Sequence, residues 1–266
     1  MIIRETIDLL YERIGNKLNS VRVSDVRIGM FLTAVELSDG SAGAAATQCA
    51  DHPFCRKTER DFGPLTPSKI KGTAVTDIMY SEKNSGLISS LRMAVMNALS
   101  STLLTDASYR IHRNSDPLEF LYLNEKMTVT IVGAFQSYIR KISAAGSRLN
   151  VLEMNREALN EEQRKYFVPA DDYATVIPES DIVIITGQTL VNDTIDNLLN
   201  SVADGTRVIV TGPSGSIIPD ILFRNNVSIV GATRITDSRL MFDVVGEGGT
   251  GFHLFEYCAE KITLLR

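Results

Sequence analysis

From about residue 127 to the end of the chain, short apolar runs alternate with segments that have helical spacing. The segment Asp181–Ile185 has four consecutive apolar residues after its aspartate, which is typical of a strand buried on both faces of a parallel sheet. Strands and helices that alternate at this spacing are joined by right-handed crossovers in a doubly wound sheet. The sequence therefore predicts an α/β fold with a Rossmann-like domain in its C-terminal half.

The apolar runs place the expected strands of this domain. These strands are Met127–Val132, Leu149–Leu152, Asp181–Ile185, Arg207–Val210 and Val227–Val230. Apolar residues at helical spacing predict a helix that ends at Gly146 and another over residues 193–202. We expect one more apolar helix to run from Thr250 to residues 262–265.

The first hundred residues have a different rhythm and predict a small α+β domain. Helical spacing covers residues 6–18 and 87–104, and an extended segment covers residues 26–37. The Asp39-Gly40 pair that follows is a strong hairpin signal, because glycine tolerates the positive φ of a tight turn. A polar segment ending in Pro117 separates the two patterns, so the expected domains are residues 1–115 and 116–266.

Composition narrows the class of protein. Of 266 residues, 27 are Lys or Arg and 32 are Asp or Glu, and this net charge of -5 argues against nucleic acid as a partner. No apolar stretch approaches the roughly 18 residues of a membrane helix, and acidic residues interrupt the N-terminus, so we expect neither a membrane partner nor a signal peptide. The odd count of three cysteines fits a reducing compartment and a cytoplasmic protein. Acidic two-domain proteins of this kind commonly form homodimers, although the sequence does not determine the oligomeric state.

Each expected strand ends in glycine or a small polar residue, or is followed by an acidic one. In an open parallel sheet, ligands bind outside the carboxyl ends of the strands, where glycine lets the backbone approach them closely. Single glycines are common in such turns, but the set as a whole favours a small-ligand site. The candidate ligand-binding residues are Gly133, Glu153, Thr186, Gly187, Thr189, Asn192, Gly212, Pro213, Ser214, Gly231 and Gly248.

The dinucleotide fingerprint is incomplete. Gly133 lacks the second and third glycines that admit a pyrophosphate. Glu153, 20 residues further on, stands where a ribose-binding acid would be. An enzyme using a nucleotide-like cofactor, of the NAD or S-adenosylmethionine type, is therefore the alternative reading.

Two segments contain residues that could bind a metal. Cys49-Ala-Asp-His-Pro-Phe-Cys55 offers two thiolates, His52 and Asp51 to one divalent ion, but its spacing is not that of a structural zinc site, and plain loop residues are the more frequent outcome. The glycine-rich loop around Glu247 could close over the crevice, with Glu247 as a metal ligand or general base, while a solvated surface loop is at least as frequent.

Three segments together resemble a known family. They are Asp181-Ile-Val-Ile-Ile-Thr-Gly-Gln-Thr-Leu-Val-Asn-Asp-Thr194, Gly212-Pro-Ser214 and Gly246-Glu-Gly-Gly249, with weaker similarity at Gly43-Ala44 and Asn97-Ala98. The family comprises prokaryotic proteins labelled as putative heavy-metal chelation, in which an enolase-N-terminal-like domain precedes a Rossmann-like one. The resemblance implies a site in the cleft between the domains and a role in binding or chelating metal. It does not imply enolase activity, because the enolase metal ligands belong to a barrel that this chain lacks.

The leading hypothesis is a protein that binds a small molecule or a metal ion, including a divalent heavy metal or a metal-chelating molecule, in the cleft between its domains. A nucleotide-dependent enzyme is the second hypothesis. A protein-interaction module with a vestigial crevice is the third.

Overall fold

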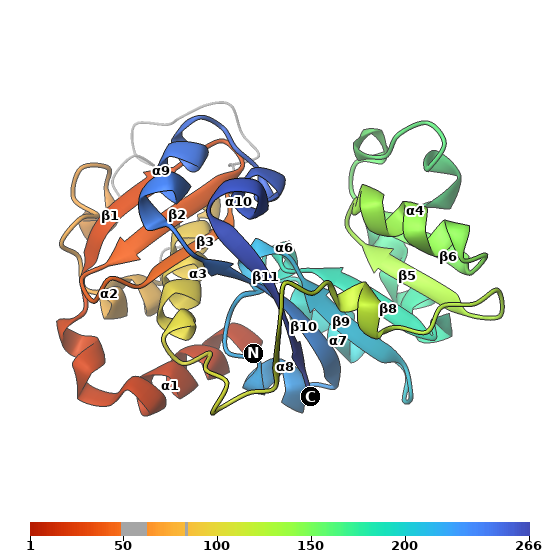
Figure 1. Ribbon diagram of the computed structural model, residues 1–266, viewed down its shortest axis with the longest axis horizontal. Coiled ribbons are helices and arrows are strands. Elements are labelled where there is room, and N and C mark those ends of the chain that lie inside the picture. Colours follow the sequence, from red (N-terminus) through yellow and green to blue (C-terminus); the bar gives the residue numbers. More distant parts are fainter. Residues whose placement is uncertain (49–62, 83–84) are drawn as a thin grey trace.

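The computed structural model describes residues 1–48, 63–82 and 85–266, which form two lobes (Figure 1). The N-terminal lobe holds an antiparallel sheet of order β1-β2-β3, with α3 packed against it. Its elements are α1 (Ile2–Ile14), β1 (Val23–Ile28), β2 (Leu32–Leu37), β3 (Ala42–Ala46), α2 (Val75–Met79) and α3 (Gly86–Ser101).

The expected α+β character of this lobe is confirmed, with one correction. The Asp39-Gly40 turn joins β2 to β3, and Gly40 has the positive φ of 85° that such a turn needs. The single extended segment expected over residues 26–37 is two strands, because the chain reverses between Ile28 and Leu32. Met30 and Phe31, which are both exposed, form this turn between β1 and β2. Their apolar side chains gave the turn the same sequence pattern as a strand.

The larger sheet has the order β4-β11-β10-β9-β8-β5-β6-β7 in the described part of the chain. Its six parallel strands follow the 3-2-1-4-5-6 order of a Rossmann fold, with β5 as the first strand. All five predicted strands are present. The strands are β4 (Ile111–Arg113), β5 (Thr128–Val132), β6 (Arg148–Glu153), β7 (Phe167–Pro169), β8 (Ile182–Thr186), β9 (Arg207–Thr211), β10 (Val227–Ile235) and β11 (Ala259–Leu265).

Short helices connect these strands. They include η4 (Pro117–Phe120), α4 (Gln136–Ala144), α5 (Tyr173–Val176), α6 (Gln188–Val191), α7 (Ile195–Asn200), η9 (Pro213–Gly215), α8 (Asp220–Arg224), α9 (Ser238–Gly246) and α10 (Gly251–Tyr257). The helix expected over residues 193–202 begins later and follows a separate turn of helix, because Asp193 adopts a positive φ of 60° between α6 and α7. In the described residues, no helix is both long enough and apolar enough to cross a membrane.

The C-terminal tail departs from the prediction. The helix expected from Thr250 through residues 262–265 ends at Tyr257, and β11 pairs antiparallel with β10. Ile262 and Leu264 are both buried, and Thr263 between them is buried too, so this short run is covered on both faces of the sheet. A short apolar run does not distinguish a strand from a helix by periodicity, and pairing with β10 decides the outcome.

Contacts among the described residues pack the two lobes together. The connection from β10 to β11 leaves the large sheet, and its helix α9 packs on β1 and β2 of the N-terminal sheet, with α10 beside α9 (Figure 1). There Met241 and Val245 form a buried cluster with Leu32. On one face of the large sheet, a continuous core contains residues of α1, α3, β8 and β9. The N-terminal lobe is therefore an integral part of the packing of the Rossmann-like sheet.

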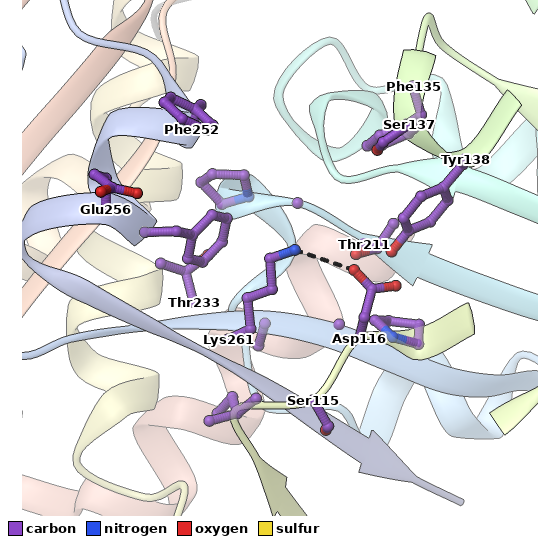
Figure 2. Close-up of a pocket in the computed structure, with 18 residues that line it drawn as sticks. Ser115, Asp116, Phe135, Ser137, Tyr138, Thr211, Thr233, Phe252, Glu256 and Lys261 are labelled. Carbon is purple, nitrogen blue, oxygen red and sulfur yellow. Dashed lines mark hydrogen bonds and ion pairs between the residues drawn. The ribbon is translucent and has the colours of Figure 1, made fainter. Parts of the chain in front are cut away.

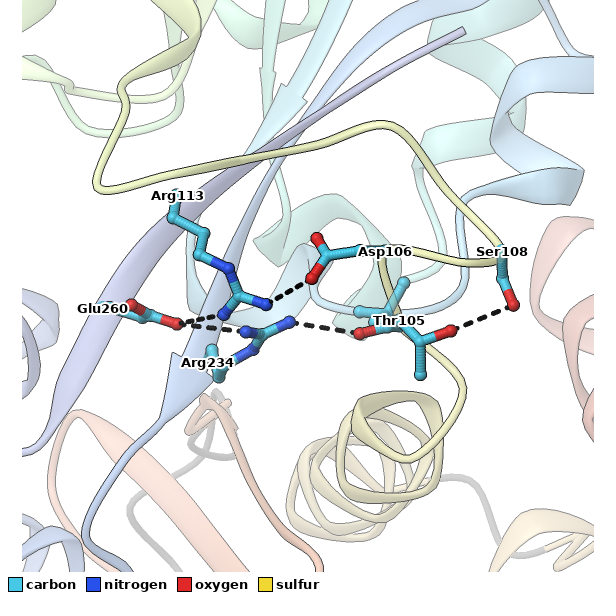
Figure 3. Close-up of polar contacts among 7 residues, drawn as sticks. Thr105, Asp106, Ser108, Arg113, Arg234 and Glu260 are labelled. Carbon is cyan, nitrogen blue, oxygen red and sulfur yellow. Dashed lines mark hydrogen bonds and ion pairs between the residues drawn. The ribbon is translucent and has the colours of Figure 1, made fainter.

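An ion-pair network ties the link between the lobes to the edge of the large sheet (Figure 3). Glu260 of β11 contacts Arg113 of β4 at 3.4 Å and Arg234 of β10 at 3.2 Å. Arg234 also donates a hydrogen bond of 3.1 Å to the carbonyl of Leu104, and Arg113 pairs with Asp106. These contacts set the course of the chain that leads into Asp116.

Candidate functional site

Two cavities lie at the carboxyl edge of the parallel strands. The first, which we call the cleft cavity, has a volume of about 430 Å³ and separates α4 from α10. The second, which we call the switch-point cavity, has a volume of about 290 Å³ and lies over the ends of β5, β6 and β8. Strands β6 and β8 flank β5 on opposite sides, which is the point where the strand order reverses.

The cleft cavity is lined by aromatic walls and a polar floor (Figure 2). Phe135 and Tyr138 come from the start of α4, and Phe252 and Phe255 come from α10. The other lining residues are Ser115, Asp116, Pro117, Ser137, Thr211, Gly212, Pro213, Gly231, Ala232, Thr233, Gly251, Glu256, Lys261 and Ile262. An apolar cavity with a few convergent polar groups is the usual form of a small-molecule site.

Asp116 and Lys261 are the polar centre of this cavity. The Lys261 ammonium lies 3.1 Å from the Asp116 carboxylate and 5.3 Å from the centre of the Phe255 ring. Asp116 is only 9% exposed, and it also accepts a hydrogen bond of 3.1 Å from the backbone N–H of Leu118. It therefore caps η4, and Glu119 completes a capping box by accepting from the N–H of Asp116. The sequence Asp-Pro-x-Glu is the local signal that could have identified this residue.

The carboxylate of Asp116 is held in its charged form. Burial alone would raise its pKa, but hydrogen bonds from Tyr138, the Leu118 N–H and Lys261 outweigh that effect and lower the pKa below its usual value. Burial, together with the charge of Asp116, raises the pKa of Tyr138. Tyr138 therefore stays protonated beside the charged Asp116. The buried side-chain oxygen of Thr233 has no hydrogen-bond partner among the described residues.

This electrostatic arrangement predicts how acid affects stability. A lowered pKa in the folded state means that Asp116 stabilises the fold above its unfolded pKa of about 4, and that this contribution disappears as pH falls through the folded value. Asp116→Asn keeps a capping oxygen but has no charge. Denaturant unfolding should therefore show the largest difference between parent and variant near neutral pH, shrinking in acid. A difference that does not vary with pH would contradict the charge assignment.

The structure distributes the residues expected from the sequence over several places. Gly212, Pro213 and Gly231 line the cleft cavity. Gly133, Glu153, Thr186, Thr189 and Asn192 come together in the switch-point cavity. Asp116, Tyr138, Lys261 and the phenylalanines of α10 were not expected from the sequence.

Ser214 lies at a junction between the lobes, which we call the interlobe joint and which also contains Gly43 and Asn97, and Gly187 packs next to it against Gly215. The Ser214 hydroxyl accepts a hydrogen bond of 2.8 Å from the N–H of Ala46, at the end of β3. A Cβ added to Gly187 would lie 2.4 Å from the backbone nitrogen of Gly215, so only glycine permits this approach. These contacts give both residues a structural role, outside the lining of either cavity.

The expected metal ligands are not brought together in the described residues. Glu247 and Gly248 line a separate surface hollow with Asp243 and His253. The imidazole of His253 is engaged with Thr250 at the start of α10, and no group of three potential ligands suitable for a metal occurs within residues 1–48, 63–82 and 85–266. Cys49, Asp51, His52 and Cys55 lie outside the described residues. Cys258 is buried in the core, and burial raises the pKa of its thiol to about 11.

Family models account for most of the chain. A model described as "Putative heavy-metal chelation" matches residues 116–264, and a second model with the same description matches residues 11–100. The chain belongs to this family. The description of the family suggests metal chelation as the function that its members share.

Solved structures of family members have the same fold. A protein with unknown function from this family in Pyrococcus horikoshii is 18% identical, with a TM-score of 0.78 and coverage of 100% of both chains. A second, from Desulfitobacterium hafniense, is 16% identical, with a TM-score of 0.75 over 99% of this chain and 98% of the other. An uncharacterized protein of Methanocaldococcus jannaschii is 32% identical over 62 residues, which is 23% of this chain and 24% of that protein. These similarities establish the fold of the family member described here.

Proposed function

We propose that the cleft cavity binds a small organic molecule that carries both a carboxylate and an amine, the chemistry of simple amino-carboxylate metal chelators. The observation that carries this proposal is the Asp116–Lys261 pair at the centre of an aromatic-walled cavity between the lobes. A ligand carboxylate would meet the Lys261 ammonium, whose side chain is 46% exposed, and a ligand amine would meet the acidic groups of Asp116 and Glu256.

The cleft residues do not fit a bare divalent cation. The Asp116 carboxylate already accepts from the Leu118 N–H, and the Lys261 ammonium 3.1 Å away would repel a metal ion. A buried divalent ion needs several oxygen, nitrogen or sulfur ligands, and the described residues supply no group of three. The metal in the family description therefore fits this cavity when an organic ligand coordinates it and the cavity residues bind that ligand.

Calorimetry with defined probes tests this function. The probes are histidine and iminodiacetate, which both carry an amine and a carboxylate, each alone and as its Zn²⁺ complex, with Zn²⁺ alone for comparison. We expect a chelator or its complex to bind saturably, and Zn²⁺ alone to bind no more tightly to the parent than to the variants below. If none of the four organic probes binds, or if Zn²⁺ alone binds in a way that depends on Asp116, the proposal is wrong.

Lys261→Met tests the role of the ammonium. The substitution keeps an unbranched apolar stem against Phe255 but removes the charge, so affinity for the bound probe should fall roughly tenfold or more. Lys126→Met is the matched control, because Lys126 is exposed and lies outside the cavity lining. An equal loss of affinity in both variants would show that Lys261 has no specific role.

A further inference from the structure

We propose that the switch-point cavity is a second binding site, and that it takes a nucleoside without phosphate groups. The cavity is separate from the cleft cavity, with which it shares no lining residue. It lies at the carboxyl ends of β5, β6 and β8, the crevice in which open α/β sheets bind ligands. Its lining residues are Val132, Gly133, Leu152, Glu153, Met154, Ala170, Asp171, Tyr173, Thr186, Gln188, Thr189, Asn192, Thr194, Asn197 and Leu198.

Glu153 is placed to bind the two ribose hydroxyls. It ends β6, the second strand of the Rossmann order, where a carboxylate can accept hydrogen bonds from a ribose. Its Oε1 accepts from the N–H groups of Met154 at 2.8 Å and Asn155 at 3.2 Å, which fixes the carboxylate. In the part of the chain that the structure describes, Oε2 makes no hydrogen bond. The second oxygen is therefore available to a ligand.

The remaining lining suits a planar base. Val132, Leu152 and Leu198 supply apolar surface, and the ring of Tyr173 lies beside it, half-buried. The side chains of Thr186 and Asn192 add hydrogen-bonding groups. The volume of about 290 Å³ is close to the lower limit for ligand cavities, roughly 300 Å³. The space therefore matches a nucleoside better than a dinucleotide.

The charges of the cavity select against phosphate. Among the described residues that line it, Glu153 and Asp171 are charged, and none is Lys or Arg. Phosphate sites need exposed backbone N–H groups or cations, and the turn after β5 has Gly133 alone in place of a glycine-rich loop. A phosphate on the same nucleoside would meet like charges here, so an uncharged or cationic nucleoside derivative is favoured over AMP, ATP or NAD.

Calorimetric titration of the full chain with adenosine, guanosine, cytidine and uridine tests the proposal. We expect at least one of them to bind saturably. Its 2′-deoxy counterpart should bind roughly tenfold to a hundredfold more weakly, because the carboxylate loses a hydroxyl partner. Its 5′-monophosphate should also bind more weakly. Failure of all four nucleosides to bind, or tighter binding of the monophosphate or of NAD, would overturn the proposal.

Glu153→Gln tests whether Glu153 recognises the ribose hydroxyl groups. Glutamine keeps Oε1 for the two backbone N–H groups but removes the charge, so the preference for ribose over deoxyribose should shrink several-fold. Glu161→Gln, at an exposed position outside the cavity, should keep that preference. If Glu153→Gln kept the full preference for ribose over deoxyribose, the assignment of Glu153 to the ribose hydroxyl groups would be overturned. The two cavities share no lining residue, so this site and the proposed chelator site can fail independently.

Discussion

Asn97→Asp is expected to destabilise the protein by about 3–5 kcal/mol near neutral pH, because it places an unpaired charge in a buried cage of carbonyl groups. Asn97 is 3% exposed in the middle of α3. Its amide nitrogen donates to the carbonyl oxygens of Ala44 at 2.8 Å, Pro213 at 3.1 Å and Ser214 at 3.4 Å. Aspartate has nearly the same shape, but an ionised carboxylate cannot donate to any of these oxygens.

The pH dependence of this effect separates charge from packing. Repulsion by the carbonyl groups and burial should raise the folded pKa of the new carboxyl group above its unfolded value of about 4. The penalty should therefore be full above the folded pKa and should diminish as pH falls through it, where the protonated acid can again donate. Denaturant unfolding of parent and variant at several pH values measures this difference.

Asn200→Asp is the matched control. Asn200 is exposed at the end of α7, so the same chemical change there should alter the unfolding free energy by no more than about 0.5 kcal/mol. A loss of less than about 1 kcal/mol in Asn97→Asp near neutral pH would show that the amide donor does not hold the joint together.

Gly43→Ala is expected to cost about 3 kcal/mol or more, because the added methyl group has no space. A Cβ at this position would lie 2.4 Å from the backbone nitrogen of Ala98 and 2.5 Å from the carbonyl oxygen of Ala94. Both atoms belong to the backbone of α3, so relief requires the helix to move away from β3. Such a movement would also strain the hydrogen bonds of Asn97, one residue before Ala98 in the same helix.

Gly246→Ala provides the control for Gly43→Ala. Gly246 is exposed in the last turn of α9, and a Cβ added there meets no atom within 4 Å. Alanine in a helix is favoured over glycine by roughly 0.5–1 kcal/mol, so this variant should be neutral or slightly more stable. Thermal and denaturant unfolding of both variants measure the contrast. Similar stabilities for the two variants would refute the close-packing argument.

Periodicity in the sequence predicted the parallel sheet because its signal is local. Each strand of β5, β6, β8, β9 and β10 is a short apolar run with its own boundary residues, and all five were predicted from those runs. The reversal at Met30 and the strand β11 were mispredicted, because turns with apolar residues and short apolar runs have no distinct local pattern.

The sequence also located the carboxyl edge of the sheet, and with it Gly133, Glu153, Thr186 and Asn192, which the fold brings into one cavity. The rule that ligands bind beyond the carboxyl ends of parallel strands needs only the strand order along the chain. The sequence did not show which of the glycines and hydroxyl groups face a cavity. Ser214 lies instead in the interlobe joint, since its environment depends on where β3 docks.

The sequence by itself therefore determined the Rossmann-like sheet and the position of its carboxyl edge, because both follow from local apolar periodicity. Only the tertiary structure decided the cleft cavity. Its central pair, Asp116 and Lys261, is separated by 145 residues. One of its aromatic walls comes from the start of α4, and the other comes from α10, which precedes β11 in the chain. Contacts of this kind depend on long-range packing and strand pairing, for which no local segment of the chain carries a signal.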